Sequence, residues 1–230
     1  MRIKKLLLLG LLGLSITHID AVLAKNSPTQ KSCEYKNKKN RDYTNCIINK
    51  KFLPVMKEMH AYKDVCKIIN LNNANYSGAQ ILPNAFSCQG YQLSLKSKGT
   101  HYSILNSQCV SLKKANFHKA MLSKNSFLVN GGTINAQGAK FKETTIEAST
   151  FNAGGVFQNA STTLAKRSIN LKKAVFTNAK IQSGAFFPNG GTIDLTGAID
   201  LGKNLNAKSN IFNMTQGGSI ITPEGNLIRK

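Results

Sequence analysis

Carboxylate side chains, which most hydrolytic sites need, are scarce and widely spaced in this chain of 230 residues. It contains only 10 Asp and Glu residues, and none lies within 65–142 or 148–193. A glycosidase needs two suitably spaced carboxylates. The available pairs are Glu143 with Glu147 and Asp194 with Asp200. Both pairs fall on outward positions of the repeat described below, so we expect them to be solvated surface residues. A calcium-dependent polysaccharide lyase would need an acidic cluster, and the sequence shows none.

A cysteine–histidine nucleophile is formally possible, with Cys88 or Cys109 as the thiol and His101 as the base. Disulfide bonding is the expected fate of these thiols, because all cysteines lie in the first half of the chain after an export signal. Five cysteines predict two disulfides and one spare thiol, with the connectivity left open. The disulfide candidates are Cys33, Cys46, Cys66, Cys88 and Cys109.

Metal and cofactor motifs are not visible in the sequence. It has no C-x2-C pair and no H-x3-5-H pair, which zinc sites commonly use. It also lacks a phosphate-binding loop and a nucleophile elbow. We therefore predict no metal, no cofactor and no catalytic residue, and a protein that is not an enzyme.

The positive charge is the main functional signal. Lys and Arg number 31, so the formal net charge is +21. Such a surface favours anionic partners: lipopolysaccharide, anionic lipid, acidic glycan or nucleic acid. Lys predominates over Arg, and Lys is a poor reader of base edges, so sequence-specific nucleic-acid recognition is not expected. A basic composition that only serves solubility is the alternative.

The N-terminus predicts export. Arg2, Lys4 and Lys5 precede the apolar run Leu6–Ile16, and Val22-Leu23-Ala24 fits a cleavage site. Residues 1–24 are therefore predicted to be a signal peptide, which places the protein in the periplasm or outside the cell. No other apolar run is long enough for a transmembrane helix.

Residues 25–70 are predicted to form a small N-terminal cap tied by disulfides. Its first part is rich in lysine. From Pro54 to about Lys67, apolar residues recur at roughly helical spacing, which predicts one amphipathic helix.

Residues 71–230 follow a period of five. Large apolar residues recur in groups of three, and a small residue stands two positions before each; seven of these twelve small residues are Ala. A chain that turns a corner every five residues would bury both. The large residues are Tyr76, Ile81, Phe86, Phe117, Leu122, Phe127, Phe141, Ile146, Phe151, Phe176, Ile181 and Phe186. Four Gly-Gly pairs would supply positive φ at wider corners.

A longer repeat overlies this period, because 112–134 resembles 171–193 at an offset of 59 residues. Self-similarity at a fixed period is typical of a solenoid, in which stacked units share one core. The predicted fold class is therefore an all-β solenoid.

Ala115-Asn116-Phe117-His118-Lys119 resembles a pentapeptide repeat, and the segments 130–138 and 190–202 resemble rungs of secreted β-helices of the filamentous-haemagglutinin type. Both resemblances imply a right-handed β-helix. Pentapeptide-repeat proteins that mimic DNA are acidic, so that function does not carry over to this basic chain.

The sequence therefore predicts a secreted, non-enzymatic β-helix that presents a lysine-rich surface to an anionic partner. Equivalent positions of a solenoid share one face, so the lysines of the two 59-residue copies should lie together. The predicted patch comprises Lys113, Lys114, Lys172, Lys173, Lys119, Lys142 and Lys180, with Lys124 and Lys140 as extensions. The alternatives are an enzyme acting on an acidic polysaccharide, and an envelope protein that oligomerises through an end of the solenoid.

Overall fold

The computed structural model describes residues 30–35, 41–54, 65–97, 100–154, 167–201 and 210–230. The chain divides into two units, Met1–Gln30 and Lys31–Lys230. The predicted signal peptide lies outside the described residues. The second unit is built from strands, and its described residues contain no helix.

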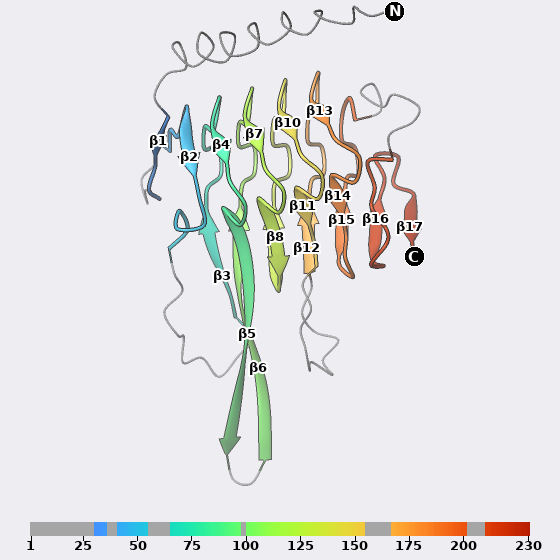
Figure 1. Ribbon diagram of the computed structural model, residues 1–230. Coiled ribbons are helices and arrows are strands. Elements are labelled where there is room, and N and C mark those ends of the chain that lie inside the picture. Colours follow the sequence, from blue (N-terminus) through green and yellow to red (C-terminus); the bar gives the residue numbers. More distant parts are fainter. Residues whose placement is uncertain (1–29, 36–40, 55–64, 98–99, 155–166, 202–209) are drawn as a thin grey trace, which may run out of the picture. The chain divides into compact units, whose positions relative to one another are not determined.

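One side of this unit is a six-stranded parallel sheet in which strands far apart in the sequence lie side by side (Figure 1). Its order is β1 (Lys31–Ser32), β2 (Cys46–Ile48), β4 (Gln80–Ile81), β7 (Met121–Leu122), β10 (Thr145–Ile146) and β13 (Lys180–Ile181). The register aligns one branched aliphatic residue per strand from Ile48 to Ile181. Such a register gives the stacked, in-line rungs of a β-solenoid.

The second sheet has eleven strands and contains two stacks of mainly parallel strands joined by the antiparallel pair β5–β6. One stack holds the start of β5 (Phe86–Ser97), then β8 (Phe127–Asn130), β11 (Phe151–Asn152) and β14 (Phe186–Phe187). The other holds β3 (Val65–Asn70), β6 (Thr100–Ser111), β9 (Gly132–Asn135), β12 (Arg167–Asn170), β15 (Thr192–Asp194), β16 (Ser219–Ile221) and the antiparallel β17 (Leu227–Arg229).

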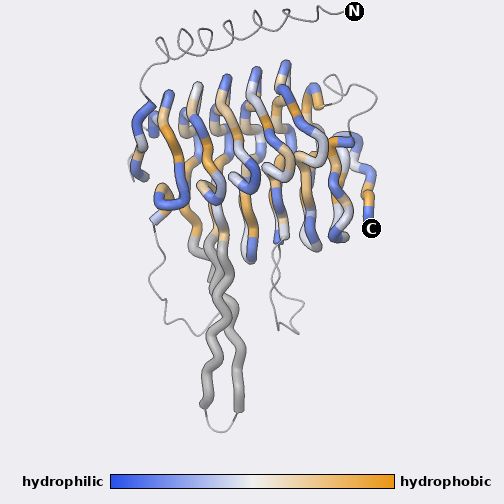
Figure 2. The backbone as a smooth tube through the Cα atoms, viewed as in Figure 1, coloured by the Kyte–Doolittle hydropathy of each residue, from blue (hydrophilic) through white to orange (hydrophobic). Residues whose placement is uncertain are grey.

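A fourth row of contacts consists of isolated parallel bridges. This bridge row runs through Asp42, Asn75, Asn116, Lys140, Val175 and Ile199. Each turn of the chain thus passes the bridge row, the six-stranded sheet and the two stacks of the second sheet in a constant order. Figure 2 shows how hydrophilic and hydrophobic stretches recur from one rung to the next.

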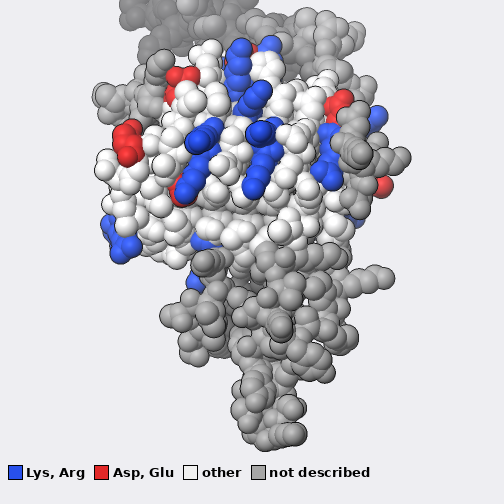
Figure 3. Space-filling model, turned by 180° about the vertical axis from the view of Figure 1, so that it is seen from behind, with Lys and Arg blue, Asp and Glu red and all other residues white. Residues whose placement is uncertain are grey.

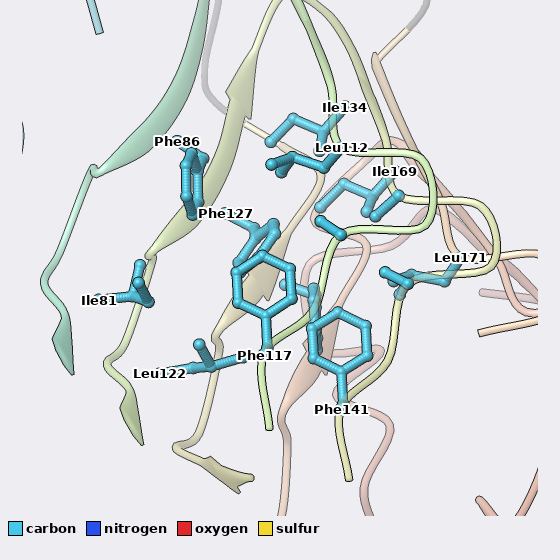
Figure 4. Packing of buried hydrophobic residues seen from close by; sticks show 14 of the residues in the cluster. Ile81, Phe86, Leu112, Phe117, Leu122, Phe127, Ile134, Phe141, Ile169 and Leu171 are labelled. Atoms are coloured by element: carbon cyan, nitrogen blue, oxygen red, sulfur yellow. The ribbon is translucent and has the colours of Figure 1, made fainter. Parts of the chain in front are cut away.

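The large residues predicted for the core lie in it. Phe117, Phe127, Phe141, Phe151, Phe176 and Phe186 are all fully buried. Phe117 and Phe176 stack on the two faces of Phe141, with ring centroids 5.0 Å apart in both cases. Figure 4 shows Phe117 and Phe141 beside each other within the aliphatic part of the core. The five-residue period is thereby confirmed as a packing pattern.

The corners are tight turns that need a left-handed residue. In the turn Leu112–Ala115, the Ala115 N–H donates to the Leu112 carbonyl at 3.0 Å, and Lys114 has φ of 56°. A positive φ at the third position defines a type II turn, which normally takes Gly or Asn there. Ala115 follows and is fully buried, because a larger side chain would not fit beside the crossing backbone.

The third corner of each rung departs from the predicted pattern. The residues two positions before the aromatic ring, such as Asn125 and Ser149, are left-handed corner residues rather than buried ones. The small buried residue is the next one, Ser126 or Thr150. The turn here starts one residue later, at Ser123, as the bond from Ser126 N–H to its carbonyl shows.

The 59-residue offset corresponds to two rungs rather than to neighbouring ones. Val110 pairs with Ile134, 24 residues on, and Ile134 pairs with Ile169, 35 residues on. The longer rung contains residues 155–166, which lie outside the described part of the chain. Similarity at 59 residues therefore joins every second rung.

The N-terminal segment contributes strands to the same sheets. Cys33 and Cys46 form a disulfide between the start of the chain and β2. The helix predicted from Pro54 to about Lys67 falls mostly outside the described residues. Its last positions, from Val65 on, belong to β3, so the helix does not extend to Lys67; pairing with β6 takes precedence over the helical spacing.

Ser126→Ala is expected to raise the free energy of unfolding by about 1 kcal/mol. The Ser126 hydroxyl is buried without a hydrogen-bond partner, and an unsatisfied buried hydroxyl costs stability. Ala85 and Ala185 occupy the same position in other rungs. Thr150→Ala is the control, because the Thr150 hydroxyl donates to a carbonyl; it should lower stability. Urea unfolding of both variants tests the pair, and a destabilised Ser126→Ala contradicts the expectation.

Candidate functional site

The four lysines of the two sequence copies lie in one corner of the solenoid. This lysine corner consists of Lys113, Lys114, Gln137, Gly138, Lys172 and Lys173. The Lys114 N–H donates to the Gln137 carbonyl, and the Gly138 N–H donates to the Lys172 carbonyl. The two lysine pairs are therefore two rungs apart, about 10 Å at the usual strand spacing.

Glycine separates the lysines along this corner. A Cβ atom added at Gly138 would lie 3.6 Å from Lys114 Cγ, and one at Gly197 would lie 3.6 Å from Lys173 Cγ. Each left-handed lysine thus sends its aliphatic stem past a glycine of the following rung. The stems have room there, and both side chains are exposed.

Other predicted lysines surround the adjacent bridge row. Lys140 belongs to the row itself, and Lys119 and Lys142 lie at the corner beyond it. All three are exposed. Figure 3 shows this arrangement from behind: Lys side chains gather over the middle of the face, while Asp and Glu lie mainly toward its edges.

Two of the predicted lysines lie elsewhere. Lys180 belongs to β13 of the six-stranded sheet, and Lys124 lies at the third corner. Both are exposed, but neither belongs to the lysine corner. The rung geometry thus separates Lys180 from the other members of the predicted patch.

Acidic partners balance only part of this charge. Glu143 lies 3.7 Å from the ammonium groups of both Lys119 and Lys142. Lys172 pairs with Asp194 at 3.2 Å. Within the described residues, the structure shows no ion pair for Lys113, Lys114, Lys140 and Lys173. Exposed pairs of this kind each contribute at most about 1 kcal/mol, so the surface keeps a strong positive potential.

Asp194 is held in its charged form. Burial tends to raise its pKa, but hydrogen bonds from Thr196 and the Lys172 ammonium outweigh that effect, so the pKa lies below its usual value. Asp194 therefore anchors Lys172 at neutral pH, which the sequence analysis did not foresee. The register that brings Asp194 beside β12 is what creates the pair.

The carboxylate pairs considered for hydrolysis serve local contacts. Glu147 accepts the Lys124 N–H at 2.9 Å, and Asp200 accepts the Thr177 hydroxyl. Glu143 is shared by two lysines, as described above. These contacts hold the carboxylates against corners of the rungs.

The cysteines differ in their states. Burial raises the pKa of the Cys88 thiol to about 12, which keeps it protonated at neutral pH, and it is free. Cys109 is disulfide-bonded. The proposed base His101 and the state of Cys66 lie outside the side chains that the structure describes.

A pocket of about 440 Å³ opens where the last rungs meet, lined among others by Ser183, Asn210, Phe212, Asn213 and Lys230. No Asp or Glu side chain lines it. The described residues contain no group of three or more His, Cys, Asp or Glu side chains placed to hold a metal ion. Among them, no helix is long and apolar enough to cross a membrane.

Comparison of the chain with protein-family models, with curated proteins and with solved structures gave no match. The fold therefore stands on its own strand register, and the site on its own geometry. The lysine corner is the feature in which sequence position, exposure and charge coincide.

Proposed function

We propose that this protein is a secreted, non-enzymatic binding protein whose lysine corner binds an anionic surface or polymer. In this proposal residues 1–24 are cleaved on export, and the stacked rungs form a right-handed, four-sided β-helix like those of pentapeptide-repeat proteins. The ligand class is lipopolysaccharide, anionic lipid, acidic glycan or nucleic acid bound without sequence preference.

The observation that carries the proposal is lysine in left-handed conformation. Among the described residues, twelve non-glycine residues have positive φ; six are Asn, and three are Lys114, Lys119 and Lys173. A left-handed backbone costs most L-residues about 1–2 kcal/mol. The same corner uses Asn73, Gly138 and Gly197 in other rungs.

Stability alone would favour Asn or Gly at these three positions. Lysine places an ammonium group at the apex of the turn, where its side chain extends away from the stack. Strain that is kept despite an available relief is typical of functional positions. The gain in this case is a row of charges that a polyanion can neutralise.

The quadruple variant Lys113→Gln, Lys114→Asn, Lys172→Gln and Lys173→Asn tests this function. Near an anionic surface each Lys contributes about 1 kcal/mol, so affinity at low salt should fall by about 100-fold or more. The probes are heparin, vesicles containing anionic lipid, and a single-stranded DNA oligonucleotide. Titration at several salt concentrations should also show a weaker salt dependence for the variant than for the wild type.

The matched control removes the same number of charges elsewhere, by Lys→Gln at 31, 50, 51 and 124. It should change affinity only slightly. Because Asn suits a left-handed turn, the quadruple corner variant should remain as stable as the wild type, which thermal unfolding checks. Equal losses in both variants would mean that net charge alone is responsible, and unchanged binding in the corner variant would refute the site.

A further inference from the structure

The base of the β5–β6 hairpin brings a free thiol close to a disulfide. The two strands pair antiparallel as far as Gly90 opposite Ser107. Two residues further along each strand are Cys88 and Cys109, so the register places them opposite each other where the strands diverge into separate stacks. Cys88 is a free thiol, and Cys109 is disulfide-bonded.

One residue contacts both sulfur atoms. The Cys88 thiol donates to the Thr133 carbonyl oxygen at 3.3 Å. The Thr133 hydroxyl donates to Cys109 Sγ at 3.3 Å. Thr133 belongs to β9, which pairs with the end of β6. A single side chain and its own carbonyl therefore link the thiol to the disulfide sulfur inside a packed core.

Cross-strand neighbours have the separation that a disulfide requires. Directly opposed residues of an antiparallel pair have Cα atoms about 4.5–5.5 Å apart, and disulfides span about 4.4–6.8 Å. A Cys88–Cys109 bond would therefore fit the hairpin register with only a small closing movement at its base.

We propose that Cys88 is an exchange thiol that can displace the existing disulfide partner of Cys109 and form a Cys88–Cys109 bond. The Cys88 thiolate attacks Cys109 Sγ, and the new S–S bond forms as the old one breaks. The electron pair of the broken bond leaves on the partner sulfur, which takes up the proton that Cys88 released. The numbers of thiols and disulfides stay the same, so no oxidant or reductant is needed.

The packed core keeps this exchange dormant. Only the thiolate attacks a disulfide, and burial holds the pKa of Cys88 near 12. Separation of the strands at the hairpin base would admit water and restore ordinary thiol reactivity. The exchange would then fasten β5 to β6 by a covalent link, so that the state of the hairpin base is recorded in the disulfide pattern.

The experiment is peptide mapping of the full chain without reduction. The protein, purified with its native disulfides, is incubated at pH 7.5, 8.5 and 9.5 in the presence of subdenaturing urea, then acid-quenched, alkylated and digested. A linked Cys88–Cys109 peptide is expected, and its initial rate should rise about tenfold per pH unit because the thiolate fraction does so below the pKa. Without urea the rate should be much lower.

The control Cys88→Ser removes the attacking sulfur and should leave the native linkage of Cys109 unchanged at every pH. Far-UV circular dichroism checks that this variant keeps its strands. The proposal fails if Cys88 becomes alkylated in urea while no Cys88–Cys109 peptide forms. It also fails if Cys88 links instead to Cys33 or Cys46, since that would indicate general scrambling.

Discussion

Phe141→Ala is expected to lower the free energy of unfolding by about 3–5 kcal/mol, the usual cost of emptying an aromatic core site. Phe141 is fully buried in the middle of the aromatic column. Besides its two stacking partners, Phe151 meets it edge-on with ring centroids 5.7 Å apart. The loss should be large because rungs on both sides are fixed by sheet hydrogen bonds and cannot close the cavity.

The comparison is Phe212→Ala, at the end of the neighbouring aromatic column. Phe212 is only partly buried, and its ring contacts Phe186 at 5.9 Å. We expect a loss of about 1 kcal/mol, since a partly exposed ring gives back less apolar area. Guanidinium unfolding monitored by circular dichroism gives both values. Equal losses would mean that stacking inside the column adds nothing to burial.

Gly191→Ala is expected to cost about 3 kcal/mol or more, the upper range for overpacking a filled site. A Cβ atom at Gly191 would overlap the Ala153 carbonyl oxygen and lie 2.7 Å from that of Arg167. These atoms are backbone, so relief would require neighbouring rungs to separate. The reason is close approach, because Gly191 itself does not have a left-handed φ.

Gly190→Ala separates the two uses of glycine in one dipeptide. Gly190 has φ of 81°, and a Cβ atom there would meet nothing within 4 Å. Only backbone strain opposes that substitution, so about 1 kcal/mol is expected. Thermal unfolding of both variants measures the difference. If Gly190→Ala proved the more harmful change, the close approach at Gly191 would not be the controlling contact.

The sequence predicted the core better than the connections. A residue such as Phe117 recurs because every rung must fill the same interior space, and that constraint is local and periodic. The Gly-Gly pairs were predicted to supply positive φ, and Gly190 does so. Gly191 is required by a carbonyl of another rung, which no pattern within the pair can show.

The hairpin β5–β6 was not predicted, because a periodic argument passes over residues that interrupt the period. The pairing of Lys172 with Asp194 was missed for a related reason: the partners belong to different rungs. The lysine corner was foreseen as a shared face, but its two-rung spacing depended on counting residues that form one whole extra rung between the copies.

The corner between the two stacks of the second sheet accepts chains of very different length. One rung passes it at Asn130–Gly132, and another passes it with the twelve positions 155–166 added. Lengthening a connection costs little, about 0.6 kcal/mol for each doubling, and here the strands on either side keep their register. The stack therefore separates architecture from length at this corner, which makes it the natural place to graft a foreign peptide, and the place where related chains can diverge in size while keeping one interior.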